Sequence, residues 1–151
     1  IMNKIALYLF LIIGLFSCKG EDGRDGRDGT NGAGSNLFTK TITINKDQWL
    51  LDGEPNELNS YYFARVKVPE LTSEVLNSGL KQVFIQPYEG LQLLMPNTIH
   101  RGISNNGEET LWSEHYKCEY EVGYITFIVS YSDFITETPP SAESFKLFLN
   151  W

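Results

Sequence analysis

YITFIVSYSD, residues Tyr124–Asp133, decides the fold class of this chain. Every second position is apolar or aromatic: Ile125, Phe127, Val129 and Tyr131. Alternation with a period of two is typical of a β-strand that turns one face toward a core. Val122-Gly123, just before this stretch, is a turn that leads into it.

Segments on both sides of this stretch have the same strand character, and turn-forming residues separate them. Each segment is rich in β-branched or aromatic residues, which favour strands. We therefore predict an all-β domain over residues 37–151, an antiparallel β-sandwich of about seven strands. The other expected strands are Phe38–Asn45, Tyr61–Val68, Leu80–Tyr88, Leu91–Met95, a short edge strand Ile99–Ile103, Thr110–Tyr120 and Phe145–Trp151.

One short helix is expected between the second and third of these strands. Thr72 offers an N-cap hydroxyl, Val75 and Leu76 form an apolar patch, and Gly79 suits the C-terminal stop. We expect this turn to cross from one sheet of the sandwich to the other.

The N-terminal segment, residues 1–17, reads as a signal peptide. Lys4 gives a short positive start, and the apolar run that follows is shorter than the roughly 20 residues of a spanning helix. Leu15-Phe16-Ser17-Cys18 resembles the lipobox of bacterial lipoproteins, although Phe16 departs from its commonest form. The resemblance implies cleavage before Cys18 and a lipid on its sulfur. A plain secretory signal or an uncleaved anchor are the alternatives.

Residues 18–36 read as a tether. Glycine occupies every third position from Gly20 to Gly32, which is the spacing of collagen. The stretch has no proline and few triplets, so we expect a polar spacer, with trimerisation as the alternative. Its aspartates are three apart, which does not fit the alternate ligand positions of a calcium loop.

Together, the lipobox, the short Gly-x-x run and a β-domain that ends in Phe145-Lys-Leu-Phe148 resemble collagen-like lipoproteins of the Bacteroidota, which are otherwise uncharacterised. The resemblance implies a lipid anchor in the outer membrane, at the cell surface or the periplasmic face. Lys19 and Glu21-Asp22 resemble a surface-export signal, with Gly20 interrupting it. The family brings no catalytic residues.

The charge of the chain excludes some partners. The formal net charge is −7, and Lys4 is the only charged residue before Cys18, so cleavage makes the chain more acidic still. Nucleic acids and anionic lipid surfaces are bound through Lys and Arg, so neither suits this chain. Membrane attachment is therefore expected through the lipid on Cys18.

No catalytic, metal or cofactor motif stands out, and we expect no enzyme activity. His100 and His115 lie outside any metal-ligand spacing, and His115 falls on the expected outer face. We interpret Cys118 as a small buried hydrophobe, with a Cys18–Cys118 disulfide as the alternative. A solvated acidic face accounts for Glu108, Glu109, Glu114, Glu119 and Glu121.

Binding through aromatic side chains is the favoured hypothesis. Trp49, Tyr61 and Tyr88 are the candidate binding residues, with Trp49 preferred as an exposed ring beside acidic residues. Trp112 and Tyr116 are further candidates, for which core packing is the favoured role. The expected function is a lipid-anchored envelope protein whose sandwich binds a glycan or a protein. The alternatives are a structural component of an envelope assembly and a glycan hydrolase.

Overall fold

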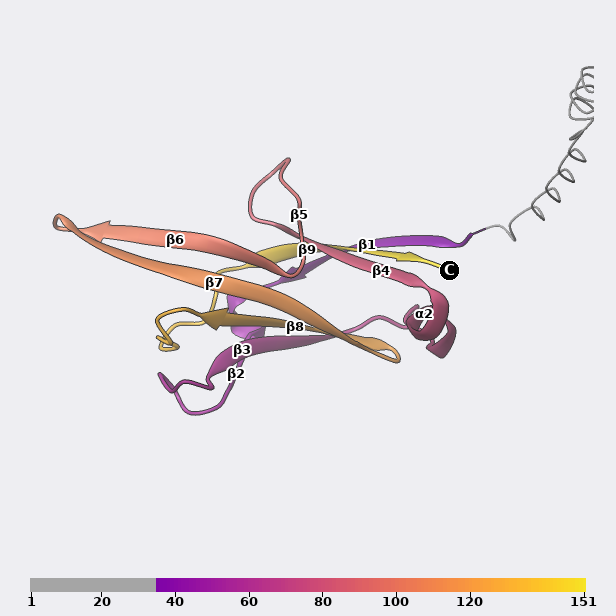
Figure 1. Ribbon diagram of the computed structural model, residues 1–151, viewed down its shortest axis with the longest axis horizontal. Coiled ribbons are helices and arrows are strands. Elements are labelled where there is room, and N and C mark those ends of the chain that lie inside the picture. Colours follow the sequence, from indigo (N-terminus) through magenta and orange to yellow (C-terminus); the bar gives the residue numbers. More distant parts are fainter. Residues whose placement is uncertain (1–34) are drawn as a thin grey trace, which may run out of the picture. The chain divides into compact units, whose positions relative to one another are not determined.

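The computed structural model describes residues 35–151 (Figure 1), so the signal peptide, Cys18 and the Gly-x-x run lie outside the described residues. The elements are β1 (Leu37–Ile44), the 3-10 turn η2 (Lys46–Gln48), β2 (Leu50–Asp52), β3 (Tyr61–Lys67), α2 (Ser73–Ser78), β4 (Leu80–Gln86), β5 (Leu93–Leu94), β6 (Asn97–Asn105), β7 (Glu108–Glu121), β8 (Tyr124–Tyr131) and β9 (Glu143–Asn150).

The strands form two antiparallel sheets, and this confirms the predicted β-sandwich. One sheet has four strands in the order β1-β9-β4-β5, and the other has five in the order β2-β3-β8-β7-β6. The described residues hold nine strands rather than about seven. The short strand β2, which pairs with the start of β3, was not predicted. Its three residues are too few to show a period.

The core lies between the inner faces of the two sheets, and β8 is central to it. β8 lies between β3 and β7, and its residues Ile125, Phe127 and Val129 are fully buried. Opposite them, β9 contributes Phe145 and two leucines, and the ring centroids of Phe127 and Phe145 lie 4.3 Å apart. The alternation in YITFIVSYSD predicted a strand with one face toward the core, and the burial of Ile125, Phe127 and Val129 confirms it.

The predicted crossover helix is α2. Thr72 caps it by accepting a hydrogen bond from the backbone N–H of Val75 at 3.3 Å. Lys81 donates from Nζ to three carbonyls at its C-terminal end, those of Val75, Leu76 and Gly79. α2 connects β3 in the five-stranded sheet with β4 in the four-stranded sheet. Across residues 35–151, no helix has the length and apolar character that crossing a bilayer requires.

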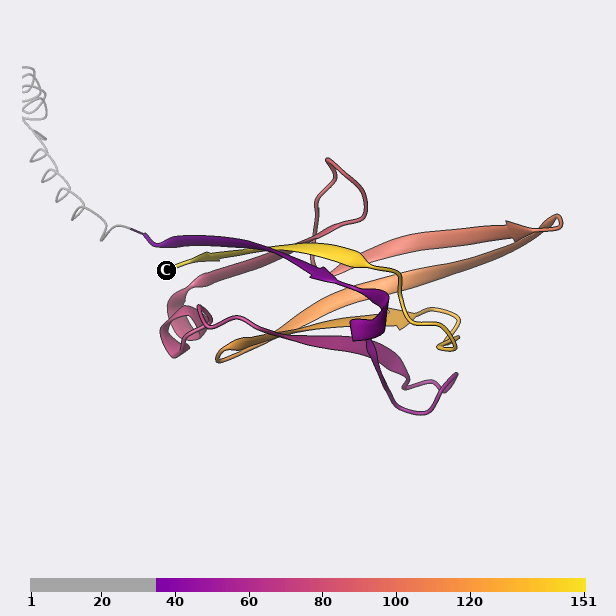
Figure 2. The ribbon, with the colours of Figure 1, turned by 180° about the vertical axis from the view of Figure 1, so that it is seen from behind.

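The hairpin of β6 and β7 extends past the rest of its sheet. β7 pairs with β6 from Glu108 onward but with β8 only from Glu114 onward. The end of the hairpin therefore stands clear of β8, as both views show (Figures 1 and 2). The predicted edge strand Ile99–Ile103 is confirmed as an edge, but β6 is longer, at nine residues.

Candidate functional site

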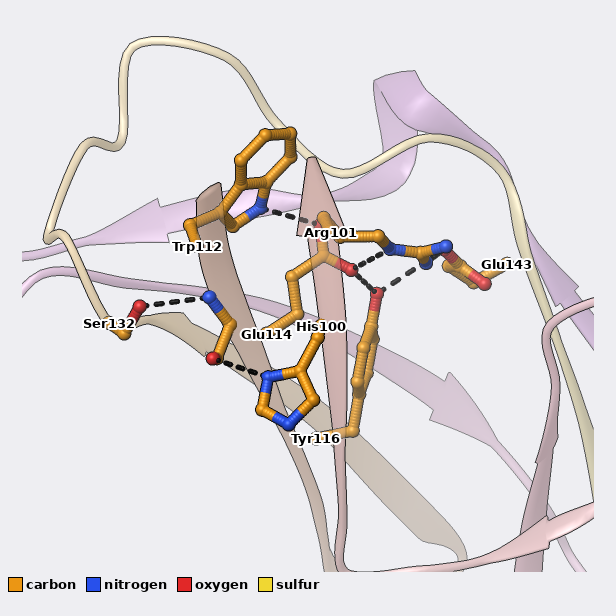
Figure 3. Close-up of polar contacts among 8 residues, drawn as sticks. His100, Arg101, Trp112, Glu114, Tyr116, Ser132 and Glu143 are labelled. Atoms are coloured by element: carbon orange, nitrogen blue, oxygen red, sulfur yellow. Dashed lines mark hydrogen bonds and ion pairs between the residues drawn. The ribbon is translucent and has the colours of Figure 1, made fainter. Parts of the chain in front are cut away.

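A cluster of charged side chains lies on the inner face near the base of this hairpin (Figure 3). Arg101 of β6 donates from Nε to Oε2 of Glu114 at 2.8 Å and from Nη2 to Oε1 of Glu143 at 3.0 Å. The hydroxyl of Tyr116 lies 2.9 Å from the same Glu114 oxygen and 3.2 Å from the same Glu143 oxygen. Because Glu143 begins β9, this cluster links the two sheets.

The sequence prediction for Glu114 was wrong. It was assigned to a solvated acidic face, whereas its side chain is only 9% exposed. The reason is the alternation of β7, which places Glu114 on the same face as the buried Tyr116. Its other oxygen accepts a hydrogen bond from Nε1 of Trp112 at 3.2 Å, so three donors hold this carboxylate.

The cluster holds two carboxylates against one guanidinium. The side chain of Glu143 is 7% exposed and that of Arg101 is 31% exposed. Burial raises the pKa of Glu143, Arg101 opposes this rise, and the charge of Glu114 adds to it. Burial also raises the pKa of Tyr116, and both carboxylates add to that rise, so its hydroxyl stays protonated and donates.

Two hollows adjoin this cluster. The first, of about 390 Å³, lies between the inner face of the hairpin and the loop that connects β8 to β9. The second, of about 380 Å³, lies between β6, the end of β4 and the start of β9. They share four wall residues, so we treat them as one recess and name it the end groove: Ile103, Trp112, Glu114 and Ser141.

The end groove has an apolar rim and acidic walls. Ile103 and Ile135 line it and are 49% and 52% exposed, and Phe134 beside Ile135 is 39% exposed. Asp133 and Glu137 also line the first hollow. Within residues 35–151, neither of these two carboxylates has a basic side chain at ion-pair distance. The groove therefore combines exposed aliphatic surface with uncompensated negative charge.

The outer face of the same hairpin carries both histidines. Nδ1 of His100 lies 2.9 Å from the Ser113 hydroxyl, and Nδ1 of His115 lies 2.9 Å from the Thr98 hydroxyl. A third, open hollow of about 480 Å³ lies beside His115. Over the part of the chain that the structure describes, no three His, Cys, Asp or Glu side chains gather in a metal-binding group.

The structure separates the three predicted binding aromatics. Trp49 was expected to be exposed, and this prediction is wrong: it is 5% exposed and packs edge-on against Phe145. The 3-10 turn η2, which the sequence analysis did not predict, leads directly into Trp49 and β2. Tyr61 lies at the start of β3 on the outer face, half-buried. Tyr88 is 67% exposed in the loop between β4 and β5.

Of the two further aromatics, Tyr116 is buried in the core, and Trp112 is half-buried and lines both hollows. Cys118 is partly buried and its thiol donates to the Tyr120 hydroxyl at 3.4 Å. Burial raises the pKa of this thiol, so it stays protonated, although the Tyr120 hydrogen bond opposes the rise.

No family model, curated protein or solved structure matches this chain. The geometry of the chain itself is therefore what bears on its function.

Arg101 and Glu143 were not singled out from the sequence, although a signal for them exists. Arg101 alternates with Ile99 and Ile103, and Glu143 alternates with Phe145 and the leucines that follow it. A charge in phase with the apolar positions of a strand indicates an inward-facing charged group that needs a partner. β6, β7 and β9 each carry such a charge, and the structure brings Arg101, Glu114 and Glu143 together.

Proposed function

We propose that this chain is a lipid-anchored envelope protein whose β-sandwich binds another envelope macromolecule in the end groove. Leu15, Ser17 and Cys18 support the anchor, because they resemble a lipobox. Two or more acyl chains hold a protein stably at a membrane, and an acidic chain has no electrostatic route to that surface. The resemblance to Bacteroidota-type lipoproteins supports a location in the outer membrane, with the sandwich on its surface or periplasmic face.

The end groove is the observation that carries the binding role. Folding leaves Ile103 and Ile135 about half exposed around a recess that Trp112 lines. Aromatic and aliphatic side chains around a concavity with a few fixed polar groups are typical of binding sites. The cluster of Arg101, Glu114 and Glu143 holds the groove floor by joining the two sheets.

A structural component without a ligand of its own is the first alternative. The open recess with exposed aliphatic side chains at this end of the sandwich supports a binding role.

Glycan hydrolysis is the second candidate, because two carboxylates line one hollow. A retaining or inverting glycosidase places the substrate between its two carboxyl groups. Here Arg101 and Tyr116 occupy that position, since both contact the facing oxygens of Glu114 and Glu143. The pair is thus held as a structural link, which favours binding over catalysis.

A plug variant tests the proposed function. Ser141 is exposed and lines both hollows, so Ser141→Trp should fill the groove. Leu111→Trp is the matched control, because Leu111 is 72% exposed on the outer face of the same hairpin. The full chain in mild detergent is assayed against a glycan and polysaccharide panel and against a random peptide library.

The proposal expects binding that Ser141→Trp abolishes and Leu111→Trp retains. Binding that both variants retain, or no binding to either panel, would overturn it. If the chain releases sugar fragments from the glycan panel and Glu143→Gln abolishes this release, the result would support the hydrolase candidate instead.

A further inference from the structure

We infer that the end groove takes an extended peptide segment of a partner protein, one that carries Lys or Arg next to apolar side chains. This inference rests on the proposed function and names the class of partner for the same groove.

The charge of the groove selects a basic segment. Its walls carry Asp133, Glu137, Glu114 and Glu143 against the single guanidinium of Arg101. That guanidinium is already bonded to Glu114 and Glu143. Asp133 and Glu137 are both exposed, and neither has a basic side chain at ion-pair distance in residues 35–151. A Lys or Arg of the partner would supply that missing charge.

The apolar part of the rim favours a peptide over a glycan. Sugar rings are bound by stacking on the open faces of aromatic side chains. The exposed apolar side chains that line this groove are the aliphatic Ile103 and Ile135, which pack well against apolar side chains of a peptide, and polar residues such as Thr110 and Thr138 lie beside them. Trp112 is half-buried and its indole N–H is committed to Glu114, so it serves as a fixed apolar wall.

The mode of binding is through side chains in the groove and not through addition of a strand to β6. β6 is an edge strand, and its Arg101 points inward to two buried carboxylates. An inward-pointing charge on an edge strand is a device that disfavours pairing with another chain. The segment is therefore expected to cross between the hairpin and the β8–β9 loop, where the first hollow lies.

Neutralising the two free carboxylates tests the inference. Asp133→Asn with Glu137→Gln removes both charges and keeps the Oδ1 that accepts from the Ile135 amide. Asp47→Asn with Glu74→Gln is the control, with the same change in net charge at exposed sites on η2 and α2. A displayed library of random twelve-residue peptides is panned against the full chain in detergent.

We expect enriched peptides with Lys or Arg beside apolar residues, and an affinity that falls about tenfold or more in the groove variant but not in the control. The affinity should also fall as salt concentration rises. Enriched peptides without a basic residue, or equal affinity for both variants, would overturn the inference. If Ser141→Trp abolishes the binding of peptides that lack a basic residue, or of glycans, the proposed function stands and only the partner class is wrong. If Ser141→Trp abolishes no binding, both the proposed function and this inference are wrong.

Discussion

Nη2 of Arg101 lies 3.0 Å from Oε1 of Glu143, and this ion pair joins the edge strand of one sheet to the first residue of the last strand in the other. The pair places polar contacts at one end of a core that is mainly apolar. The floor of the end groove therefore depends on a few hydrogen bonds. Substitution of the side chains that form these hydrogen bonds tests this dependence.

Arg101→Met should destabilise the fold strongly. The change leaves two buried carboxylates without their cation, and breaking a buried ion pair costs about 3–5 kcal/mol. Arg65→Met is the control, because Arg65 and Glu121 form a pair whose side chains are 49% and 58% exposed. Such a surface pair is worth about 1 kcal/mol or less. Urea unfolding of both variants measures the difference, and equal losses would show that the buried cluster is not a structural link.

The stability of the fold should depend on the titration of Glu143. Its pKa is raised in the folded state, so the folded chain keeps a proton that the unfolded chain has already released. The free energy of unfolding therefore falls as pH rises from the ordinary value of 4.5 through the raised pKa. The side chain of the Glu143→Gln variant cannot ionise, so the free energy of unfolding of this variant should fall less over that pH range. Unfolding curves at several pH values check this, and an unchanged slope would contradict it.

Glu114→Gln should cost more stability at neutral pH than Glu143→Gln. Glu114 accepts hydrogen bonds from Arg101, Trp112 and Tyr116, so an amide N–H₂ in its place must face at least one of these donors. A buried donor that is left unpaired costs about 1–3 kcal/mol. The same unfolding measurement compares the two variants, and a larger loss for Glu143→Gln would reverse this ranking.

Trp49 should behave as a core residue and Tyr88 as a surface residue. Trp49→Ala removes a ring that is 5% exposed and packs against Phe145, at a cost of about 3–5 kcal/mol. Tyr88→Ala changes a side chain that is 67% exposed and should shift the unfolding free energy by about 0.5 kcal/mol or less. Thermal unfolding of the two variants tests this prediction. Similar midpoint temperatures for both would indicate that Trp49 lies at the surface.

Cys18→Ala should release the protein from membranes. The change removes the sulfur to which the lipid would attach, and no helix in residues 35–151 can replace it as a spanning anchor. Labelling with a radioactive or clickable fatty acid, followed by membrane fractionation, gives the readout. Cys118→Ala serves as the control and should keep both the label and the membrane fraction. Persistent labelling of Cys18→Ala would rule out the lipid anchor.

The fold was predictable from the sequence because its core strands obey one rule. In β8 and β9 every second side chain is buried, and a period of two is visible within a few residues. Trp49 was misassigned because η2 and β2 span only three residues each, which is too short for any period to show. Its acidic neighbours suggested a surface, while the burial comes from Phe145, far away in sequence.

The candidate site was less predictable, because its residues come mainly from four separate segments: β6, β7, the loop between β8 and β9, and the start of β9. Arg101, Glu114 and Glu143 each stand in phase with apolar positions, which favours an inward orientation, but Lys40 has the same phase in β1 and is exposed. That they meet depends on β6 lying at the sheet edge and on where β9 begins in the other sheet. The apolar rim at Ile135 belongs to a loop, for which alternation gives no rule.

Site-specific photo-crosslinking tests the central claim, that the end groove is where a partner binds. A benzophenone-bearing residue replaces Ile103 in one variant and Leu111 in another, which places the probe on the inner or the outer face of the same hairpin. Both variants are expressed as the full chain in the cells that naturally produce it, and then irradiated. The account predicts a discrete crosslinked species from position 103 that Ser141→Trp abolishes, and none from position 111. Equal crosslinking from both positions, or crosslinking from position 111 alone, would contradict it.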